Sequence, residues 1–257
     1  MPTWALHVDA DLDEVNRHWA ALDAAGMLAA AEVDDTAIIY FARRPDDPPL
    51  DGRLEHIADR DWHERWRDGL TPIRAGRWTV TPSWLATGGT DELLIDPGQA
   101  FGTGHHETTV GCLEALDALS LRGRTVLDVG TGTGVLAIAA ARAGAVATAV
   151  DVDPLATTAA SDNARRNRVS IAVVTGTLDR VAGRTFDVVV ANLDSAMLIA
   201  AAGGLARVVA PDGVLVASGV SNPRSDEVAG ALTAVGLSVE VSTGHEWSLL
   251  RARRTDG

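Results

Sequence analysis

The stretch TVLDVGTGTGVLAIAAA, residues 125–141, constrains the fold more than any other part of this chain. Its first five residues are mostly apolar and predict a buried strand, and alanine-rich sequence typical of a helix follows. Between them lie Gly130, Gly132 and Gly134, whose backbones can approach a ligand closely. The helix N-terminus behind them favours a negative or polar ligand group. We therefore predict a strand, a ligand-binding turn and a helix, with a purely structural turn as the alternative.

From residue 107 onward, strands and helices alternate. We expect helices at 107–119, 134–143, 154–166, 195–209 and 223–235, and strands at 125–129, 147–151, 171–175, 186–191, 213–218, 237–242 and 247–252. Strands separated by helices imply a parallel sheet with helices on both faces. The link between the last two strands is too short for a crossover helix. The seventh strand must therefore run antiparallel beside the sixth.

The first 42 residues have the pattern of a smaller α/β unit. Strands are expected at 4–8 and 37–41, with a helix carrying Val15, Trp19 and Leu22 between them. The segment RRPDDPPLDG at 43–52 then breaks the pattern. We predict a small domain at 1–52, a connector at 53–95 and a larger domain at 96–257. In the connector, Trp62 and Trp66 share one face of an expected helix and are predicted to pack between the domains.

Composition narrows the possible partners. The formal charge is −13, which repels nucleic-acid phosphates but attracts a basic protein or peptide. The single cysteine, Cys112, cannot form an internal disulfide. No basic leader, sustained apolar N-terminal run or membrane-length apolar segment stands out. We expect a cytoplasmic protein that binds neither membranes nor nucleic acid directly.

Two carboxylates near the glycine turn bear on the ligand. Asp128 precedes the glycines, where a carboxylate suits a cationic amino-acid ligand better than a pyrophosphate. Asp151 ends the second strand, where it can accept hydrogen bonds from ribose hydroxyls. A dinucleotide fingerprint read from Gly130 fails at Val135, although a frame from Gly132 finds the tolerated Ala137. The combination resembles class I S-adenosylmethionine-dependent methyltransferases, with a nicotinamide-dependent oxidoreductase as the alternative.

The segment AFGTGHHETT, residues 100–109, could be a phosphate cradle, a metal site or a loop that closes over a cofactor. Adjacent histidines usually point apart, and no other His or Cys pair completes a zinc pattern, so His105, His106 and Glu107 are a poor metal site. A GKS/T phosphate loop is also missing. We interpret the segment as a flap in which Phe101 covers the cofactor, Gly102 and Gly104 act as hinges, and Thr109 reaches the cofactor.

The fourth strand of the larger domain ends in Asn192. Its side-chain oxygen could accept a hydrogen bond from an attacking amine, as in the amine-modifying methyltransferases that this position resembles. Those enzymes often continue with proline and an aromatic residue, where this chain has Leu193 and Asp194. A merely structural strand-end cap is the alternative reading of Asn192.

Together, AFGTGHHETT, TGTGVLAIAAARAG, VDVDPLA and VVANL resemble the ribosomal protein L11 methyltransferase (PrmA) family. The resemblance extends over most of residues 59–257, through DRDWHERWRDGLTPIRAGRWTVTPSW and the closing HEWSLLRAR. Many members have FGTGTHPTT, so His105 and Glu107 are variant positions. The resemblance implies a seven-stranded Rossmann-like class I sheet with an antiparallel last strand, plus a small N-terminal α/β domain for substrate recognition.

The resemblance also implies S-adenosyl-L-methionine as cofactor and methylation of lysine or other amino groups of ribosomal protein L11, a basic partner. It places cofactor contacts on Thr109, Gly130, Asp151 and Asn192. We add the nearby Phe101, Gly102, Asp128 and Gly132 as cofactor-binding candidates, and Asn192 as the catalytic candidate.

Other readings stay open beside this one. The substrate could be another protein or a small-molecule amine, although a separate N-terminal domain favours a macromolecule. A nicotinamide-dependent oxidoreductase fits Asp128 and the antiparallel last strand less well. The intact cofactor residues disfavour a non-catalytic binding module. Asp194 adds a negative charge near the expected acceptor site.

Overall fold

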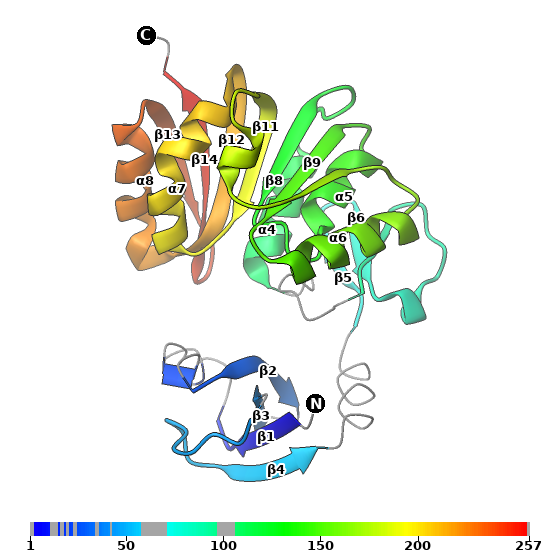
Figure 1. Cartoon of the computed structure of the whole chain (residues 1–257), viewed down its shortest axis with the longest axis vertical. Coiled ribbons are helices and arrows are strands. Elements are labelled where there is room, and N and C mark those ends of the chain that lie inside the picture. Colours follow the sequence, from blue (N-terminus) through cyan, green and yellow to red (C-terminus); the bar gives the residue numbers. More distant parts are fainter. Residues whose placement is uncertain are drawn as a thin grey trace. The chain divides into compact units, whose positions relative to one another are not determined.

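A computed structural model of the chain contains two compact units, Met1–Leu70 and Thr71–Gly257, each of which is described by itself (Figure 1). The residues that the structure describes are 3–10, 15, 18, 21–22, 25–33, 36–41, 43–57, 71–96 and 106–255. No helix in this part of the chain is both long enough and apolar enough to cross a membrane.

The first unit contains a four-stranded antiparallel sheet in the order β2-β3-β1-β4. Its strands are β1 (Thr3–Val8), β2 (Met27–Val33), β3 (Thr36–Phe41) and β4 (Arg53–Ile57). Leu6, Ile39 and Phe41 alternate into a core that also buries Val15 and Leu22. The strands predicted at 4–8 and 37–41 are confirmed, and Trp19 of the predicted helix lies outside the described residues.

Two strands of this sheet were not predicted. The sequence of β2 is mostly MLAAAE, which lacks the apolar–polar alternation of a half-buried strand. The strand forms because its backbone pairs with β3. The other is β4, which follows the proline-rich segment and pairs with β1, so the first unit continues beyond residue 52 to Leu70. Trp62 and Trp66 lie outside the described residues.

The second unit begins with a small sheet in the order β5-β6-β7, which was expected only as a connector. It comprises β5 (Ile73–Ala75), β6 (Trp78–Thr81) and β7 (Glu92–Leu94), and the 3-10 helix η1 (Ser83–Leu85) lies between the last two. Trp78 and Leu93 are buried in the same apolar cluster as the main helices, so this small sheet is part of the unit's core.

A seven-stranded sheet in the order β10-β9-β8-β11-β12-β14-β13 forms the centre of the second unit. Its strands are β8 (Thr125–Val129), β9 (Val146–Asp151), β10 (Ala172–Thr175), β11 (Phe186–Asn192), β12 (Val209–Ser221), β13 (Leu237–Thr243) and β14 (Trp247–Arg254). The last strand runs antiparallel beside β13, as predicted, and it also pairs antiparallel with β12. This insertion of β14 between β12 and β13 was not predicted.

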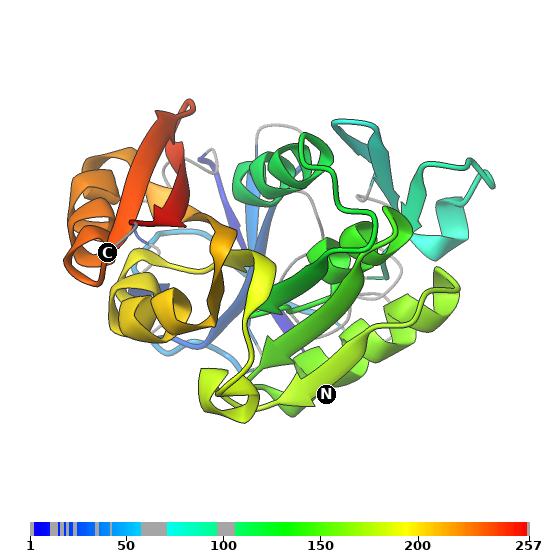
Figure 2. The same ribbon diagram turned by 90° about the horizontal axis from the view of Figure 1, so that it is seen from above.

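Within the described part of the second unit, five α-helices cover the sheet. They are α4 (Glu107–Asp117), α5 (Val135–Arg142), α6 (Pro154–Arg166), α7 (Ser195–Val208) and α8 (Ser225–Ala234), close to the predicted bounds. The alternation of β11 divides the core, because Val188 and Val190 pack with α4 and α5 whereas Val189 and Ala191 pack with α7 and α8. In Figure 2, α7, α8 and the last two strands (yellow to red) gather at one end of the sheet. The expected α/β class I architecture is confirmed.

Candidate active site

Those predicted site residues that the structure describes meet where three neighbouring parallel strands end. In the sheet order β9-β8-β11, Asp151 is the last residue of β9, Gly130 follows β8, and Asn192 is the last residue of β11. Asp128 of β8 is paired with Val190 of β11, which points to the α4 side of the sheet. Asp128 and Asn192 therefore share that face, because side chains alternate along a strand. Ligands of open α/β sheets bind at this carboxyl edge.

The glycine turn is held against β9 by its own backbone. The amides of Gly130 and Thr131 donate to the Val150 carbonyl at 2.8 and 3.1 Å. Gly130 has a φ of 69°, and a Cβ there would lie 2.3 Å from Cδ2 of Leu193. Gly134 has a φ of 85°, and its Cβ would lie 2.9 Å from the Ala160 backbone. The positive φ therefore favours glycine at both positions, and at Gly134 the Ala160 backbone also leaves no space for a Cβ.

Asp128 has two unlike carboxylate oxygens. Its Oδ2 accepts hydrogen bonds from the Thr131 hydroxyl at 2.6 Å and from the Ala137 amide at 3.1 Å. Through the second bond it caps α5, whose N-cap residue Gly134 has no side chain to do so. Its Oδ1 is buried, and no described residue forms a hydrogen bond with it. Burial raises the pKa of Asp128 to about 6, and the charge of Asp151 acts in the same direction.

This buried oxygen gives a direct test of whether the site suits S-adenosylmethionine. A buried carboxylate oxygen without a partner is costly unless a ligand satisfies it. S-adenosylmethionine brings both an ammonium and a sulfonium charge, and the glycine turn leaves room for a ligand beside the main chain. The carboxylates and the glycine turn at this edge of β8 and β9 therefore fit this cofactor.

Asp151 is held rigidly at the end of β9. Its Oδ2 accepts the Gly132 amide at 2.9 Å, and its Oδ1 accepts the Asp153 amide at 3.0 Å. Asp153 in turn caps α6 by accepting the Leu155 amide at 2.8 Å. Two fixed carboxylate oxygens with further lone pairs can still accept bonds from a pair of vicinal hydroxyls.

Asn192 contacts the predicted cofactor residue Thr109. The Asn192 Nδ2 donates to the Thr109 Oγ1 at 3.1 Å, and Thr109 is buried in the first turn of α4. Asn192 is thus part of a polar pair between two elements rather than an isolated strand-end cap. No described residue donates to its Oδ1, so this oxygen can accept a further hydrogen bond.

His106 has a structural position at the start of α4. Its Nδ1 lies 2.8 Å from the Thr108 hydroxyl and accepts from the Thr108 amide, so His106 is the N-cap residue of the helix. Its ring meets Trp247 of β14 edge to face, with 4.8 Å between ring centroids. Burial lowers its pKa, although Glu107 and Glu246 oppose that shift. Among the described residues, no group of three or more His, Cys, Asp or Glu could hold a metal ion.

Four sequence-predicted residues of the flap lie outside the described residues: Phe101, Gly102, Gly104 and His105. Asp194, whose role the sequence left open, is the N-cap of α7 and accepts the Met197 amide at 2.9 Å. Its departure from the expected aromatic residue has this local structural reason.

Sequence reasoning missed two groups of residues around the site. Leu193 lies between the glycine turn and β12, because a Cβ on Gly219 would lie 2.2 Å from its carbonyl oxygen. Asn163 in α6 and Asn167 at its C-cap are also buried. Asn163 donates to the Thr133 carbonyl in the glycine turn, and Asn167 donates to the Leu94 carbonyl in β7. Their spacing of four residues was a usable signal, because two asparagines on the inner face of a helix need partners.

Comparisons with known sequences point to one family. The family model described as ribosomal protein L11 methyltransferase (PrmA) matches residues 5–255. The ribosomal protein L11 methyltransferase of Deinococcus radiodurans is 38% identical, and the alignment covers 95% of this chain and 96% of the relative. That of Pelotomaculum thermopropionicum is 40% identical over 97% of this chain and 83% of the relative.

A solved structure is similar as well. The crystal structure of ribosomal protein L11 methylase from Lactobacillus delbrueckii subsp. bulgaricus superposes with a TM-score of 0.67 at 28% identity, covering 73% of this chain and 100% of that chain. The match of the family model over nearly the whole length, with the predicted residues gathered at one edge of the sheet, leads to one conclusion. This chain belongs to the ribosomal protein L11 methyltransferase family.

Proposed function

We propose that this chain transfers methyl groups from S-adenosylmethionine to amino groups of ribosomal protein L11, lysine side chains among them. Membership of the family supports the methyltransferase activity and the substrate protein. The restriction to amines rests on Asn192. A ribosomal substrate also favours the cytoplasm as the place of reaction.

One observation carries the proposal: Asn192, at the end of β11, is bonded to Thr109 at the edge where the glycine turn and Asp151 also lie. Its Nδ2 is engaged by the Thr109 oxygen, so its Oδ1 is the acceptor left for an N–H group. An acceptor at that point favours a nucleophile that carries a hydrogen to donate, as an amine does.

The chain's own residues would bind and orient the reactants. Asp151 would hold the ribose hydroxyls, and the Oδ1 of Asp128 would face the positive charge of the methionine part. When bound, S-adenosylmethionine supplies an electrophilic methyl group on a sulfonium centre. Phe101, Gly102, Thr109, Gly130 and Gly132 complete the proposed contacts with the cofactor.

The amine must be neutral to react. A lysine amine with an ordinary pKa is neutral in roughly one molecule in two thousand at pH 7. Removal of water and a nearby positive charge both favour the neutral form, so a dedicated strong base is unnecessary. Asn192 would then orient the amine by accepting one of its N–H groups, which keeps the nitrogen lone pair in line with the methyl group.

The experiment compares Asn192→Ala with Asn222→Ala, using methyl-labelled S-adenosylmethionine, purified ribosomal protein L11 and mass spectrometry to locate the label. Asn222 begins the 3-10 helix after β12 and binds the carbonyls of Gly244 and His245, so it is a structural control. We expect turnover to fall at least 100-fold for Asn192→Ala with the fold intact, and to change little for Asn222→Ala. Near-normal turnover of Asn192→Ala would remove Asn192 from the mechanism.

We further propose that the N-terminal unit docks the protein substrate. Its own core supports an independent role, and a small-molecule substrate would need no second unit. The predicted division into residues 1–52, 53–95 and 96–257 would place recognition in the first part. Because the first unit continues to Leu70, removal of residues 1–70 is the cleaner test. We expect methylation of ribosomal protein L11 to be lost while S-adenosylmethionine binding persists, and unchanged protein methylation would refute the docking role.

A further inference from the structure

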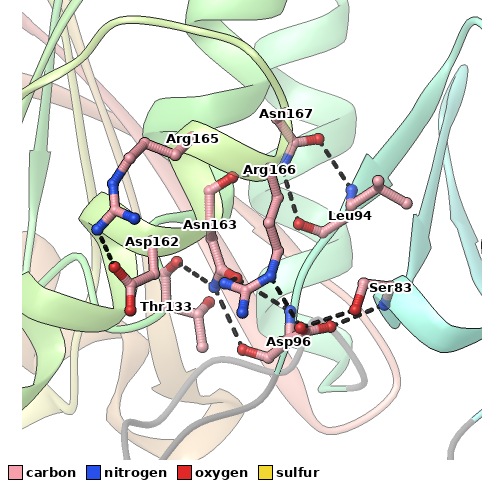
Figure 3. Close-up of polar contacts among 9 residues, drawn as sticks. All are labelled: Ser83, Leu94, Asp96, Thr133, Asp162, Asn163, Arg165, Arg166 and Asn167. Atoms are coloured by element: carbon pink, nitrogen blue, oxygen red, sulfur yellow. Dashed lines mark hydrogen bonds and ion pairs between the residues drawn. The ribbon is translucent and has the colours of Figure 1, made fainter.

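Two buried asparagines, Asn163 within α6 and Asn167 at its C-cap, lie one turn apart on the inner side of the helix. Figure 3 shows both amides directed at the end of β7 and the residues that follow it. Their side chains are 1% and 5% exposed, so each amide must find its partners within the protein. The reaction described above uses neither residue.

Each asparagine binds both backbone groups of one residue. The Asn167 Oδ1 accepts the Leu94 amide at 2.9 Å, and its Nδ2 donates to the Leu94 carbonyl at 2.7 Å. The Asn163 Oδ1 accepts the Asp96 amide at 3.1 Å, and its Nδ2 donates to the Asp96 carbonyl at 3.2 Å. A neighbouring β-strand would pair with alternate residues in the same manner.

The spacing of the two amides matches the extended chain. Four helical residues rise about 6 Å, and two residues of a strand advance about 6.6 Å. Helix α6 therefore replaces a strand at this edge of the small sheet. Leu94 and Asp96 are consequently set in one register along the helix.

Asn163 makes one further bond that Asn167 does not. Its Nδ2 also donates to the carbonyl of Thr133 at 2.9 Å, within the glycine turn (Figure 3). Gly134 is packed against Ala160 on the same face of α6. Asn163 thus joins three backbone groups: both of Asp96 and the carbonyl that lies between Gly132 and Gly134.

Asp96 is also fixed from its other side. Its Oδ1 accepts the Ser83 amide at 2.7 Å, and its Oδ2 accepts the Ser83 hydroxyl at 2.8 Å. The Arg166 Nε forms an ion pair with the same carboxylate at 2.9 Å. The backbone at Asp96 is therefore a fixed point, and Asn163 connects it to the glycine turn.

We propose that Asn163 is a positioning residue for S-adenosylmethionine, acting through the Thr133 carbonyl on the glycine turn, whereas Asn167 serves the fold alone. This inference rests on the proposed function. Without the bond from Asn163, the Thr133 carbonyl is a buried acceptor with one partner fewer, and the turn that follows β8 can shift relative to Asp151. A shift of the turn moves the amide of Gly132 away from the carboxylate that it contacts.

The test compares Asn163→Asp and Asn163→Ala with the matched variants Asn167→Asp and Asn167→Ala. Aspartate keeps the acceptor of each asparagine and removes its donors, and alanine removes both without adding charge. Only the Asn163 pair affects the bond to Thr133, because Asn167 donates to Leu94 and to the Asn163 carbonyl. Thermal unfolding of each cofactor-free variant sets an assay temperature at which it is folded.

Two readouts then separate positioning from stability. Hydrogen exchange of the cofactor-free protein should be faster at residues 131–135 in the Asn163 variants, and faster near Leu94 alone in the Asn167 variants. The Kd for S-adenosylmethionine by calorimetry should rise at least tenfold for the Asn163 variants and stay within about twofold for the Asn167 variants. Unchanged exchange and Kd in Asn163→Ala would overturn the inference, as would an equal rise in Kd for both pairs.

Failure of the proposed function gives a different result. A parent chain that binds no S-adenosylmethionine would refute the cofactor, and the exchange comparison would still decide whether Asn163 holds the glycine turn.

Discussion

Asp128 is the residue whose replacement separates stability from function most clearly. The carboxylate is buried, one of its oxygens caps α5, and no described residue forms a hydrogen bond with the other. The change Asp128→Asn keeps a side-chain oxygen for the Ala137 amide and the Thr131 hydroxyl, and it removes the charge. We expect the cofactor-free variant to be more stable than the parent at neutral pH and to bind S-adenosylmethionine at least 100-fold more weakly.

The magnitude and its sign follow from the pKa. Burial raises the pKa of Asp128 from 3.8 to about 6 in the folded state. A carboxyl with a raised folded pKa binds a proton more tightly when folded, so the parent loses stability as the pH rises from about 4 through about 6. A difference of about two pH units corresponds to roughly 3 kcal/mol, the largest gain expected of Asp128→Asn above pH 7. Below pH 4, both side chains are neutral and this gain should vanish.

Urea unfolding of the cofactor-free proteins at pH 4, 5, 6, 7 and 8 measures this difference. Asp187→Asn is the matched control, because hydrogen bonds from the amide and hydroxyl of Thr125 lower the pKa of Asp187. That carboxylate stabilises the fold above its unfolded pKa, so Asp187→Asn should be destabilising at pH 7 and less so in acid. A gain from Asp128→Asn that does not depend on pH, or a loss at pH 7, would refute the reasoning.

Three further predictions concern the residues around the glycine turn. Gly130→Ala should lower the free energy of unfolding by about 1–2 kcal/mol because of the positive φ, and by a further amount because its Cβ clashes with Leu193. In urea unfolding, the double variant Gly130→Ala/Leu193→Ala should recover only the loss that comes from the clash. If it recovers none of the lost stability, there is no clash. Thr109→Val keeps the shape of the side chain but removes the hydroxyl to which Asn192 donates. We expect kcat to fall at least tenfold and the free energy of unfolding to drop by about 1 kcal/mol. A kcat equal to that of the parent would contradict a role for Thr109 in orienting Asn192. Asp194→Ala should cost about 1 kcal/mol as a lost N-cap and leave KM for the protein substrate unchanged, whereas a lower KM would show that its charge repels the substrate.

The sequence was most informative where local chemistry decides structure. The larger domain was predictable because its strands are short apolar runs, its helices have their own periodicity, and the turn at Gly130 demands glycine. The antiparallel last strand followed from the length of one link. The strand ends Asp151 and Asn192 were identifiable because parallel strands bring their carboxyl edges together.

Contacts between distant segments were beyond the reach of those patterns. Strand β2 carries no alternation and depends on β3, and the place of β14 between β12 and β13 depends on pairing across the sheet. The bonds of Asn163 span 67 residues to Asp96 and 30 to Thr133. Likewise, the unpaired Oδ1 of Asp128 exists only because the helix and the turn close around its other oxygen.

The sequence by itself therefore determined the order of the elements, the glycine turn and the residue types at the strand ends, since each depends on neighbours in the chain. Tertiary structure alone decided which polar groups have hydrogen-bond partners. Asn192 pairs with Thr109 and the Asp96 backbone pairs with Asn163, whereas no described residue forms a hydrogen bond with Oδ1 of Asp128. The physical reason is that a hydrogen bond depends on distances of about 3 Å between atoms, which a chain sets only after its sheets and helices have packed.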